Sequence, residues 1–323
     1  MTSDMAQSML CVSRTDDSHS VLEQKRLLVD RYLACPVCKG PLRLDERAEC
    51  LQCGASYPIV NDVLVLLPAD ADAFAATLRN RYEATVGGTS LPSVFRISKE
   101  LLGNVSGRAI LDVGCSQGDF ALKHLVPGGA SVVIGVDFAV GAIRVAQQRA
   151  RALPTVLFVV GDAMALPVQS GRFDRVVVTE VIEHLPDVGA CLSELGRALA
   201  ADGEVILSTP NYFNAVGLFK PIIDKHHHGG RERWTYADHS EELEHFQTPF
   251  GVQRQFSDAG LRVLEFRGSD LWMGIRKALM MPWLLLDQVA RRVAAMPVWD
   301  VLARTPLKYF GVVQYYRLKK PGR

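Results

Sequence analysis

The chain has 323 residues, a length that predicts two domains or one large domain with a small appendage. With 48% hydrophobic and 22% charged residues, it has the composition of a soluble globular protein and not that of a disordered or collagen-like chain. Its 36 Lys and Arg residues against 35 Asp and Glu leave a net charge of +1, so it lacks the overall basic excess of dedicated nucleic-acid-binding proteins.

The N-terminal region predicts a cytoplasmic protein. Residues 1–20 are polar and contain no apolar run of the length that a secretory signal needs. The longest apolar stretch, residues 279–286, is interrupted by Pro282 and is far shorter than the roughly 20 residues of a transmembrane helix. We expect residues 1–33 to be a partly disordered lead-in, with helical apolar spacing from Val21 to Leu33.

Four of the seven cysteines form two C-x₂-C pairs, Cys35 with Cys38 and Cys50 with Cys53. Two such turns can present four thiolates to one tetrahedral ion, which is typical of structural Zn²⁺. Four sulfur ligands leave no open coordination position, so we predict that the ion folds a small β-rich module, residues 34–68, and does not activate water.

This cysteine segment resembles the zinc ribbons that are fused to methyltransferases or act as their partners. A similar arrangement precedes the catalytic domain of rRNA guanine-N1 methyltransferases. The module alone therefore leaves RNA and small-molecule substrates both open.

The rest of the chain predicts a helical linker followed by an α/β domain. Residues 74–106 have helical periodicity broken at Gly87-Gly88 and Pro92, which favours a helical linker or lid over residues 69–106. Over residues 107–323, strands alternate with helices, which predicts a mostly parallel seven-stranded sheet with a helical insertion at about 269–311. The expected strands are Ala109–Val113, Val132–Asp137, Thr155–Val160, Phe173–Thr179, Glu204–Ser208, Leu261–Arg267 and Val312–Arg317.

The first three of these strands lead into a predicted nucleoside site. Gly114 and Gly118 lie in the turn after the first strand, where they let a ligand approach the backbone and the start of a helix. The spacing fits neither a dinucleotide fingerprint nor a P-loop, which disfavours phosphate binding. Asp137 ends the second strand, where its carboxylate can accept hydrogen bonds from two ribose hydroxyls, and Asp162 follows the third, within reach of an adenine amino group.

In this order the elements resemble class I S-adenosylmethionine-dependent methyltransferases, over about 200 residues from Ile110 onward. The resemblance implies a Rossmann-like methyltransferase fold with S-adenosylmethionine as cofactor. Ser116 departs from the family pattern, in which the middle position of the loop is glycine. The positions that it implies for cofactor binding are Asp112, Gly114, Cys115, Ser116, Gly118, Asp137, Phe138, Asp162, Ala163 and Glu180.

The fourth strand leads into Glu180, Glu183 and His184, a cluster that suits two kinds of chemistry. Two carboxylates and an imidazole can hold a hard divalent ion such as Mg²⁺, or His184 can serve alone as general base for a hydroxyl nucleophile. The motif resembles ubiquinone-pathway O-methyltransferases and small-RNA 2′-O-methyltransferases, which implies catalytic and metal-binding roles for these three residues and a later histidine, matched by His245. Related methyltransferases carry the Glu-His pair without metal, with the Glu near the cofactor and the His packed.

Two further segments leave alternatives open. His226-His227-His228 either lines an acceptor pocket or belongs to a solvated loop. The C-terminal insertion has large apolar residues at helical spacing, and from Arg291 onward the chain carries eight basic residues against one acid. Such a basic amphipathic segment suits contact with an anionic membrane surface or a lipophilic acceptor, whereas the alternative is a core or dimer face.

We predict a cytoplasmic enzyme, with attachment to a membrane surface as an alternative, that transfers methyl from S-adenosylmethionine to a hydroxyl of a small or lipophilic metabolite. One rival is an RNA methyltransferase that holds RNA with the zinc ribbon, which the near-zero net charge disfavours. The other is a non-catalytic scaffold, which the acids at 112, 137 and 162 disfavour. The sequence predicts no oligomeric state.

Overall fold

The structure, a computed structural model, describes residues 20–68, 92–214, 247–271, 298–302 and 305–321. The chain forms two compact units, and each is described by itself. Unit 1 comprises Met1–Gly88, Asn104–Asp174 and Arg197–Ala200. Unit 2 comprises Thr89–Gly103, Arg175–Gly196 and Ala201–Arg323.

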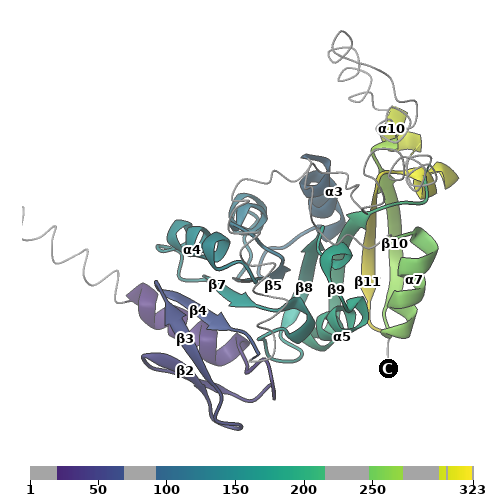
Figure 1. Ribbon diagram of the computed structural model, residues 1–323. Helices are drawn as coiled ribbons and strands as arrows, with labels where there is room; N and C mark the ends of the chain where they lie inside the picture. Colours follow the sequence, from purple (N-terminus) through teal and green to yellow (C-terminus); the bar gives the residue numbers. More distant parts are fainter. Residues whose placement is uncertain (1–19, 69–91, 215–246, 272–297, 303–304, 322–323) are drawn as a thin grey trace, which may run out of the picture. The chain divides into compact units, whose positions relative to one another are not determined.

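The sheet of unit 1 joins an N-terminal antiparallel meander to three parallel strands (Figure 1). The meander consists of β1 (Leu42–Leu44), β2 (Arg47–Cys50), β3 (Ser56–Val60) and β4 (Val63–Leu66). The parallel strands follow in the order β7 (Val156–Gly161), β6 (Val132–Asp137) and β5 (Ala109–Val113). The two residues of the β3–β4 turn both have positive φ, 50° at Asn61 and 63° at Asp62, as the tight turn of a hairpin requires.

The meander and the parallel strands meet at β4, which pairs with β7 in parallel. The register places Val65 opposite Val160 and Leu66 opposite Gly161. This pairing differs from the separate module predicted for residues 34–68, because the two segments are far apart in the sequence. β4 thereby covers the edge of β7 that would otherwise be open to other chains.

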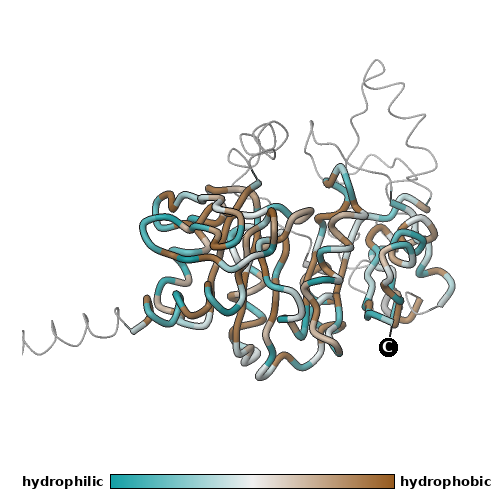
Figure 2. The backbone as a smooth tube through the Cα atoms, turned by 90° about the horizontal axis from the view of Figure 1, so that it is seen from below, coloured by the Kyte–Doolittle hydropathy of each residue, from teal (hydrophilic) through white to brown (hydrophobic). Residues whose placement is uncertain are grey.

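Burial explains why the parallel strands form. Every residue of β5 and β7 is buried, as expected of strands covered on both faces, and Figure 2 shows brown hydrophobic stretches along the strands. The strand-connecting elements are a π-helical turn, η2 (Ala121–Leu125), the helix α4 (Val140–Arg149) and a 3₁₀ turn, η3 (Ala163–Ala165). Gly135 on β6 faces the ring of Phe158, and a Cβ at Gly135 would lie 2.2 Å from that ring, so only glycine fits here.

The lead-in is helical over residues 20–32, which confirms the helix expected from the apolar spacing. Its buried face includes Leu28, Val29 and Tyr32. The Tyr32 ring lies 5.6 Å from that of Phe173, centroid to centroid. The helix is therefore packed into the core of unit 1.

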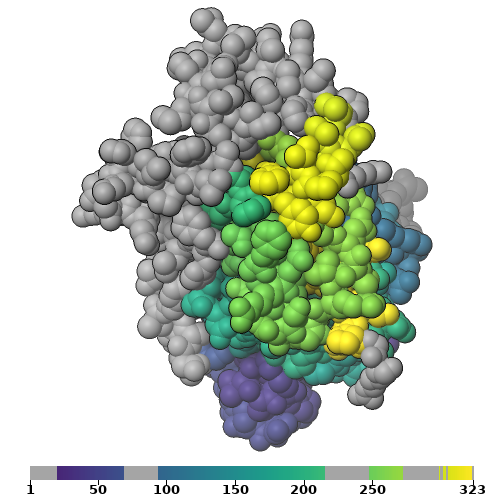
Figure 3. Space-filling view, turned by 90° about the vertical axis from the view of Figure 1, so that its right-hand side faces the viewer, coloured from purple at the N-terminus to yellow at the C-terminus, as the bar shows by residue number. Residues whose placement is uncertain are grey.

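Unit 2 contains a second group of strands in the order β8 (Phe173–Thr179), β9 (Leu199–Pro210), β11 (Val313–Lys319) and β10 (Arg262–Ser269). β11 runs antiparallel to both of its neighbours. The helices and 3₁₀ turns are α3 (Pro92–Leu102), η4 (Ile182–His184), α5 (Val188–Ala198), α7 (Pro249–Asp258), α10 (Val298–Leu302) and η5 (Pro306–Phe310). Figure 3 shows α7 and β10, in green, beside the yellow C-terminal elements.

The seven strands predicted for the α/β domain are confirmed as β5 to β11, with three of them at the predicted residues and the others displaced or extended at their ends. β9 is the longest extension, because it starts at Leu199 and not at Glu204. Most of the predicted helical insertion, the His226–His228 run and His245 lie outside the described residues. Within the described part of the chain, no helix is long and apolar enough to cross a membrane.

Candidate functional site

The loop after β5 turns sharply at three residues with positive φ: Gly114 (70°), Ser116 (47°) and Gly118 (76°). A Cβ at Gly118 would lie 2.7 Å from the Phe158 ring, so this position must stay free of a side chain. Ser116 adopts the left-handed backbone that the family's glycine adopts without strain, a conformation that costs other residues about 1–2 kcal/mol. The departure at Ser116 thus leaves the shape of the loop intact.

Asp137, at the end of β6, ties this loop to the next helix. Its Oδ2 accepts a hydrogen bond from the Ser116 N–H at 2.9 Å, and its Oδ1 accepts one from the Ala139 N–H at 2.9 Å. Each carboxylate oxygen can accept a second hydrogen bond, so the ribose hydroxyls of a nucleoside have acceptors here. Burial raises the pKa of Asp137, although the backbone N–H donors of Ala139 and Ser116 oppose the shift.

Asp112, on β5, is a buried acid beside Asp137. Burial, and then the charge of Asp137, raise the pKa of Asp112 to about 7. Its Oδ2 is buried, and none of the described residues hydrogen-bonds it. A cationic group such as the ammonium of an amino acid would satisfy this oxygen, so the residues present fit the methionine part of S-adenosylmethionine.

The predicted adenine contact, Asp162, caps the short turn η3. Its Oδ1 accepts the Met164 N–H at 2.8 Å, and its carbonyl accepts the Ala165 N–H. Asp162 and Ala163 are both partly exposed. Asp137 ends β6 and Asp162 directly follows the neighbouring parallel strand β7, as predicted, at the edge where α/β sheets bind ligands.

The acidic cluster lies in unit 2, on the turn that follows β8. Glu180 has a positive φ (55°); its Oε1 accepts a hydrogen bond from the Ser208 hydroxyl at 2.7 Å. Glu183 is buried, and its Oε2 accepts one from the Thr209 hydroxyl at 3.0 Å. The Nε2 atom of His184, a partly exposed side chain, lies 3.8 Å from Glu183 Oε1.

The structure does not bring Glu180, Glu183 and His184 together as a metal site. Among the described residues, only the four cysteines form a group of three or more potential ligand side chains with their ligand atoms close together. The reason is that each glutamate turns toward a hydroxyl of β9. Sequence reasoning missed Ser208 and Thr209, although both follow the apolar run of β9 at the sheet edge, which is the signal that marks such positions.

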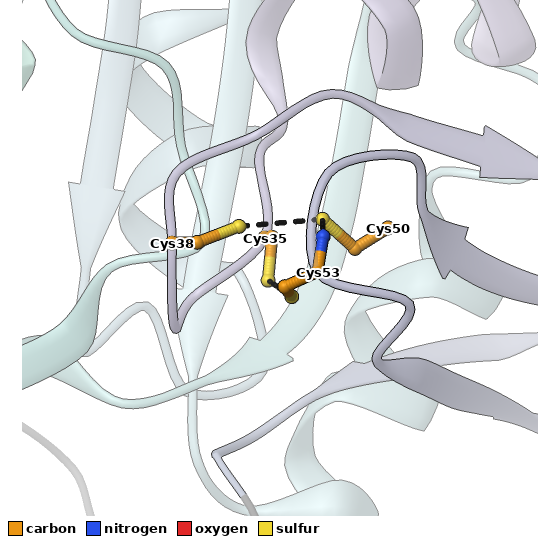
Figure 4. A group of neighbouring side chains, drawn as sticks. All are labelled: Cys35, Cys38, Cys50 and Cys53. Atoms are coloured by element: carbon orange, nitrogen blue, oxygen red, sulfur yellow. Dashed lines mark hydrogen bonds between the residues drawn. The ribbon is translucent and has the colours of Figure 1, made fainter.

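The cysteines of the two C-x₂-C pairs converge as predicted (Figure 4). All four Sγ atoms lie within 4.8 Å of one another, with Cys35 3.7 Å from Cys53 and Cys38 3.4 Å from Cys50. Tetrahedral ligands at the usual Zn–S distance are about 3.8 Å apart, so the group fits a metal ion such as zinc. The N–H groups of Gln52 and Cys53 also point at Cys50 Sγ, at 3.4 and 3.5 Å.

A hydrogen bond supports the cluster from outside. The Tyr57 hydroxyl lies 3.0 Å from Cys35 Sγ. Burial raises the pKa of Cys35, but hydrogen bonds from Tyr57 and from the backbone N–H groups of Cys38 and Val37 outweigh this effect. Together they lower the pKa of Cys35 to about 6. A thiol that deprotonates readily is what a metal ligand requires.

Comparison with known proteins decides the family. The family described as "Methyltransferase domain" matches residues 92–265, more than half of the chain. This chain is a methyltransferase of that family. Its fold is Rossmann-like, and its cofactor is S-adenosylmethionine, which is the methyl donor of such domains.

Similar curated proteins include demethylmenaquinone methyltransferases. The enzyme of Staphylococcus saprophyticus is 28% identical over 184 residues, which cover 53% of this chain and 77% of the Staphylococcus saprophyticus protein. The enzyme of Staphylococcus aureus is 29% identical over 188 residues, which cover 54% of this chain and 76% of the Staphylococcus aureus protein. Both alignments leave close to half of this chain unmatched.

Solved structures of methyltransferases are similar to this chain. A complex of the Haloferax volcanii Trm112 methyltransferase activator with a putative methyltransferase has a TM-score of 0.50 at 19% identity, covering 78% of this chain and 96% of that chain. An S-adenosylmethionine-dependent methyltransferase from Mesorhizobium loti has a TM-score of 0.49 at 16% identity, covering 70% and 96%.

Replacing Asp112 by asparagine should make the methyltransferase without cofactor more stable, and more so at alkaline pH. A carboxyl with a folded pKa of about 7 and an ordinary unfolded pKa binds its proton more tightly in the folded state. Its contribution to stability is complete below about pH 4 and is lost as the pH rises toward 7. Urea unfolding at pH 5 and pH 8 should show the advantage of Asp112→Asn growing by about 2–3 kcal/mol; an advantage independent of pH would contradict the raised pKa.

Proposed function

We propose that the methyltransferase moves the methyl group of S-adenosylmethionine to a hydroxyl of a small lipophilic metabolite. The observation that carries the proposal is the position of Asp137, which ends β6 and holds the glycine loop through Ser116. The acceptor class is supported by the similar proteins, which are named for methylating demethylmenaquinone, a lipophilic quinone. The donor supplies an electrophilic methyl group, so the protein has to position the acceptor and remove one proton.

In this proposal three acids bind different parts of the cofactor. Asp112 faces the methionine ammonium, and Asp137 accepts from the ribose hydroxyls. Asp162 and Ala163 lie at the adenine end. The remaining contacts are proposed to come from the Gly114–Gly118 loop, whose backbone turns at three residues with positive φ.

His184 is the proposed general base. Its imidazole lies beside the buried carboxylate of Glu183, which the Thr209 hydroxyl holds in place. A carboxylate next to an imidazole orients the ring and stabilises the imidazolium that forms when it accepts a proton. Glu180, whose carboxylate accepts a hydrogen bond from Ser208, keeps the cofactor-binding role proposed for it from the sequence.

A second candidate for the atom that accepts the methyl group is a ring carbon of the same kind of acceptor. Deprotonating a hydroxyl on an aromatic ring makes the oxygen nucleophilic and also enriches the neighbouring ring carbons in electrons, so the same base serves both reactions. The similarity to demethylmenaquinone methyltransferases favours this second candidate. Treating the labelled product with a reagent that cleaves aryl methyl ethers separates the two, because only an O-methyl group is released.

The cysteine module is proposed to hold structural zinc. Four thiolates around one ion leave no position for substrate. The ion therefore contributes folding free energy and not chemistry.

His184→Ala should lower kcat by about 100-fold to 10,000-fold, the usual contribution of a general base, with little change in the Kd of S-adenosylhomocysteine. The assay follows labelled methyl from S-adenosylmethionine into the organic-extractable fraction, with a reduced lipophilic quinone as acceptor. His124→Ala is the matched control, because its imidazole lies on η2 beside Phe120 and has no proposed catalytic part. An unchanged kcat in His184→Ala would leave His184 a packing residue.

The experiment that tests the acceptor class incubates the methyltransferase and labelled S-adenosylmethionine with cell extract, with and without ribonuclease. The proposal predicts label in the organic extract that ribonuclease does not remove. Label lost after ribonuclease would instead support the RNA methyltransferase.

A further inference from the structure

The first cysteine turn contacts the loop that follows the adenine-side residues. Ala34, just before Cys35, donates its N–H to the Pro167 carbonyl at 3.0 Å. Lys39, just after Cys38, donates from Nζ to the Leu166 carbonyl at 3.1 Å. Both ends of the metal-binding turn are therefore bonded to consecutive residues of one loop.

That loop contacts the residue before Asp162. Pro167 packs against Gly161, where a Cβ would lie 2.7 Å from the Pro167 ring. Gly161 is the residue before Asp162, and on its other side it is paired with Leu66 of β4. The cysteine module thus holds the residues around Asp162 through both the loop and the strand.

Contacts from the lead-in extend the same support. Two further contacts join the lead-in to the residues after Pro167. Leu33 forms an antiparallel bridge with Val168. Gln169 donates its N–H to the Tyr32 carbonyl at 2.8 Å. Lys25 is buried and donates from Nζ to the Ala150 carbonyl at 3.0 Å, at the C-terminal end of α4. α4 begins shortly after Asp137. The N-terminal region therefore contacts a segment that follows Asp137 as well as one that follows Asp162.

We infer that the cysteine module is a positioning element of the cofactor site, so that metal occupancy and affinity for S-adenosyl compounds are coupled. The metal fixes the turn from Cys35 to Cys38, the turn fixes the Leu166–Pro167 loop, and the loop fixes Asp162. Coupling of this kind is reciprocal: the factor by which zinc tightens cofactor binding equals the factor by which cofactor tightens zinc binding. The inference rests on the proposed cofactor site.

The test uses the full chain and measures the coupling through the zinc affinity. Calorimetry gives the Kd of S-adenosylhomocysteine for the zinc-loaded protein, and equilibrium competition with a chromophoric chelator gives the zinc affinity with and without saturating S-adenosylhomocysteine. We expect S-adenosylhomocysteine to raise the zinc affinity at least fivefold. Methionine, which lacks the adenosine part, should leave it unchanged.

A point variant tests the contact without removing a ligand of the metal. Lys39→Met should keep one zinc and the thermal stability of its fold, yet weaken S-adenosylhomocysteine binding about fivefold. Arg47→Met is the matched control, because the Arg47 side chain bonds Ser56 of the same module, and it should change the Kd less than twofold.

The outcomes separate this inference from the proposed function. If the zinc-loaded wild type binds no S-adenosylhomocysteine, the proposed cofactor site fails and the inference fails with it. If S-adenosylhomocysteine binds normally but does not shift the zinc affinity, or if Lys39→Met binds it as wild type does, the inference alone is overturned.

Discussion

The double replacement Cys38→Ser/Cys50→Ser is expected to abolish zinc binding and to unfold the N-terminal module. The two Sγ atoms lie 3.4 Å apart, one from each C-x₂-C turn, so the variant removes half of the ligands and both turns lose their anchor. Structural zinc sites supply about 10–16 kcal/mol of apparent binding free energy, more than the whole stability of a typical domain. The module is small, and a core of that size rarely supplies enough stabilisation to replace that contribution.

Elemental analysis and limited proteolysis check this expectation. Wild type should contain about one zinc per chain and resist cleavage over residues 34–66, whereas the variant should contain none and be cut there. Cys191→Ala is the control, since Cys191 is a buried thiol on α5, away from the cluster in sequence and outside its group. A wild-type protein that is folded and protease-resistant without zinc would contradict the assignment.

Asp137→Asn is expected to weaken S-adenosylhomocysteine binding about 100-fold or more. Hydrogen bonds to a charged group contribute about 1.5–3 kcal/mol each, and two ribose hydroxyls are proposed to donate to this carboxylate. The variant also leaves the Ser116 N–H without its charged acceptor, which loosens the loop. Calorimetry measures the change, with thermal unfolding to confirm that the fold is retained.

A deoxyribose analogue of the ligand separates the ribose contact from the effect on the loop. In wild type, loss of one ribose hydroxyl should weaken binding strongly, whereas in Asp137→Asn the same loss should change little, because contacting groups are not additive. Asp119→Asn is the matched control, a partly exposed carboxylate paired with Arg149 and Lys123. If the analogue binds both proteins with the same penalty, Asp137 does not contact the ribose.

Local pattern was sufficient to predict the strands and the metal cluster. β5, β6 and β8 have the predicted bounds because each contains an apolar run that a turn residue or a charge follows. The cysteine cluster was predictable because its geometry is contained in two short turns whose spacing is visible in the sequence.

Long-range contacts were not predictable in the same way. The pairing of β4 with β7 joins residues almost a hundred positions apart, and nothing in the Val63–Leu66 run indicates its partner. The divergence of Glu180 and Glu183 has a similar cause. Spacing along the chain suggests that they converge, but the left-handed backbone at Glu180 and the hydroxyls of Ser208 and Thr209 direct each carboxylate to its own partner.

A crystal structure of the zinc-loaded protein with S-adenosylhomocysteine tests the central claim most directly. The account predicts the ribose hydroxyls within hydrogen-bond distance of the Asp137 carboxylate, the ammonium group next to Asp112 and the adenine beside Asp162. A nucleoside bound elsewhere, or a well-ordered loop with Asp137 turned away from the ligand, would contradict it.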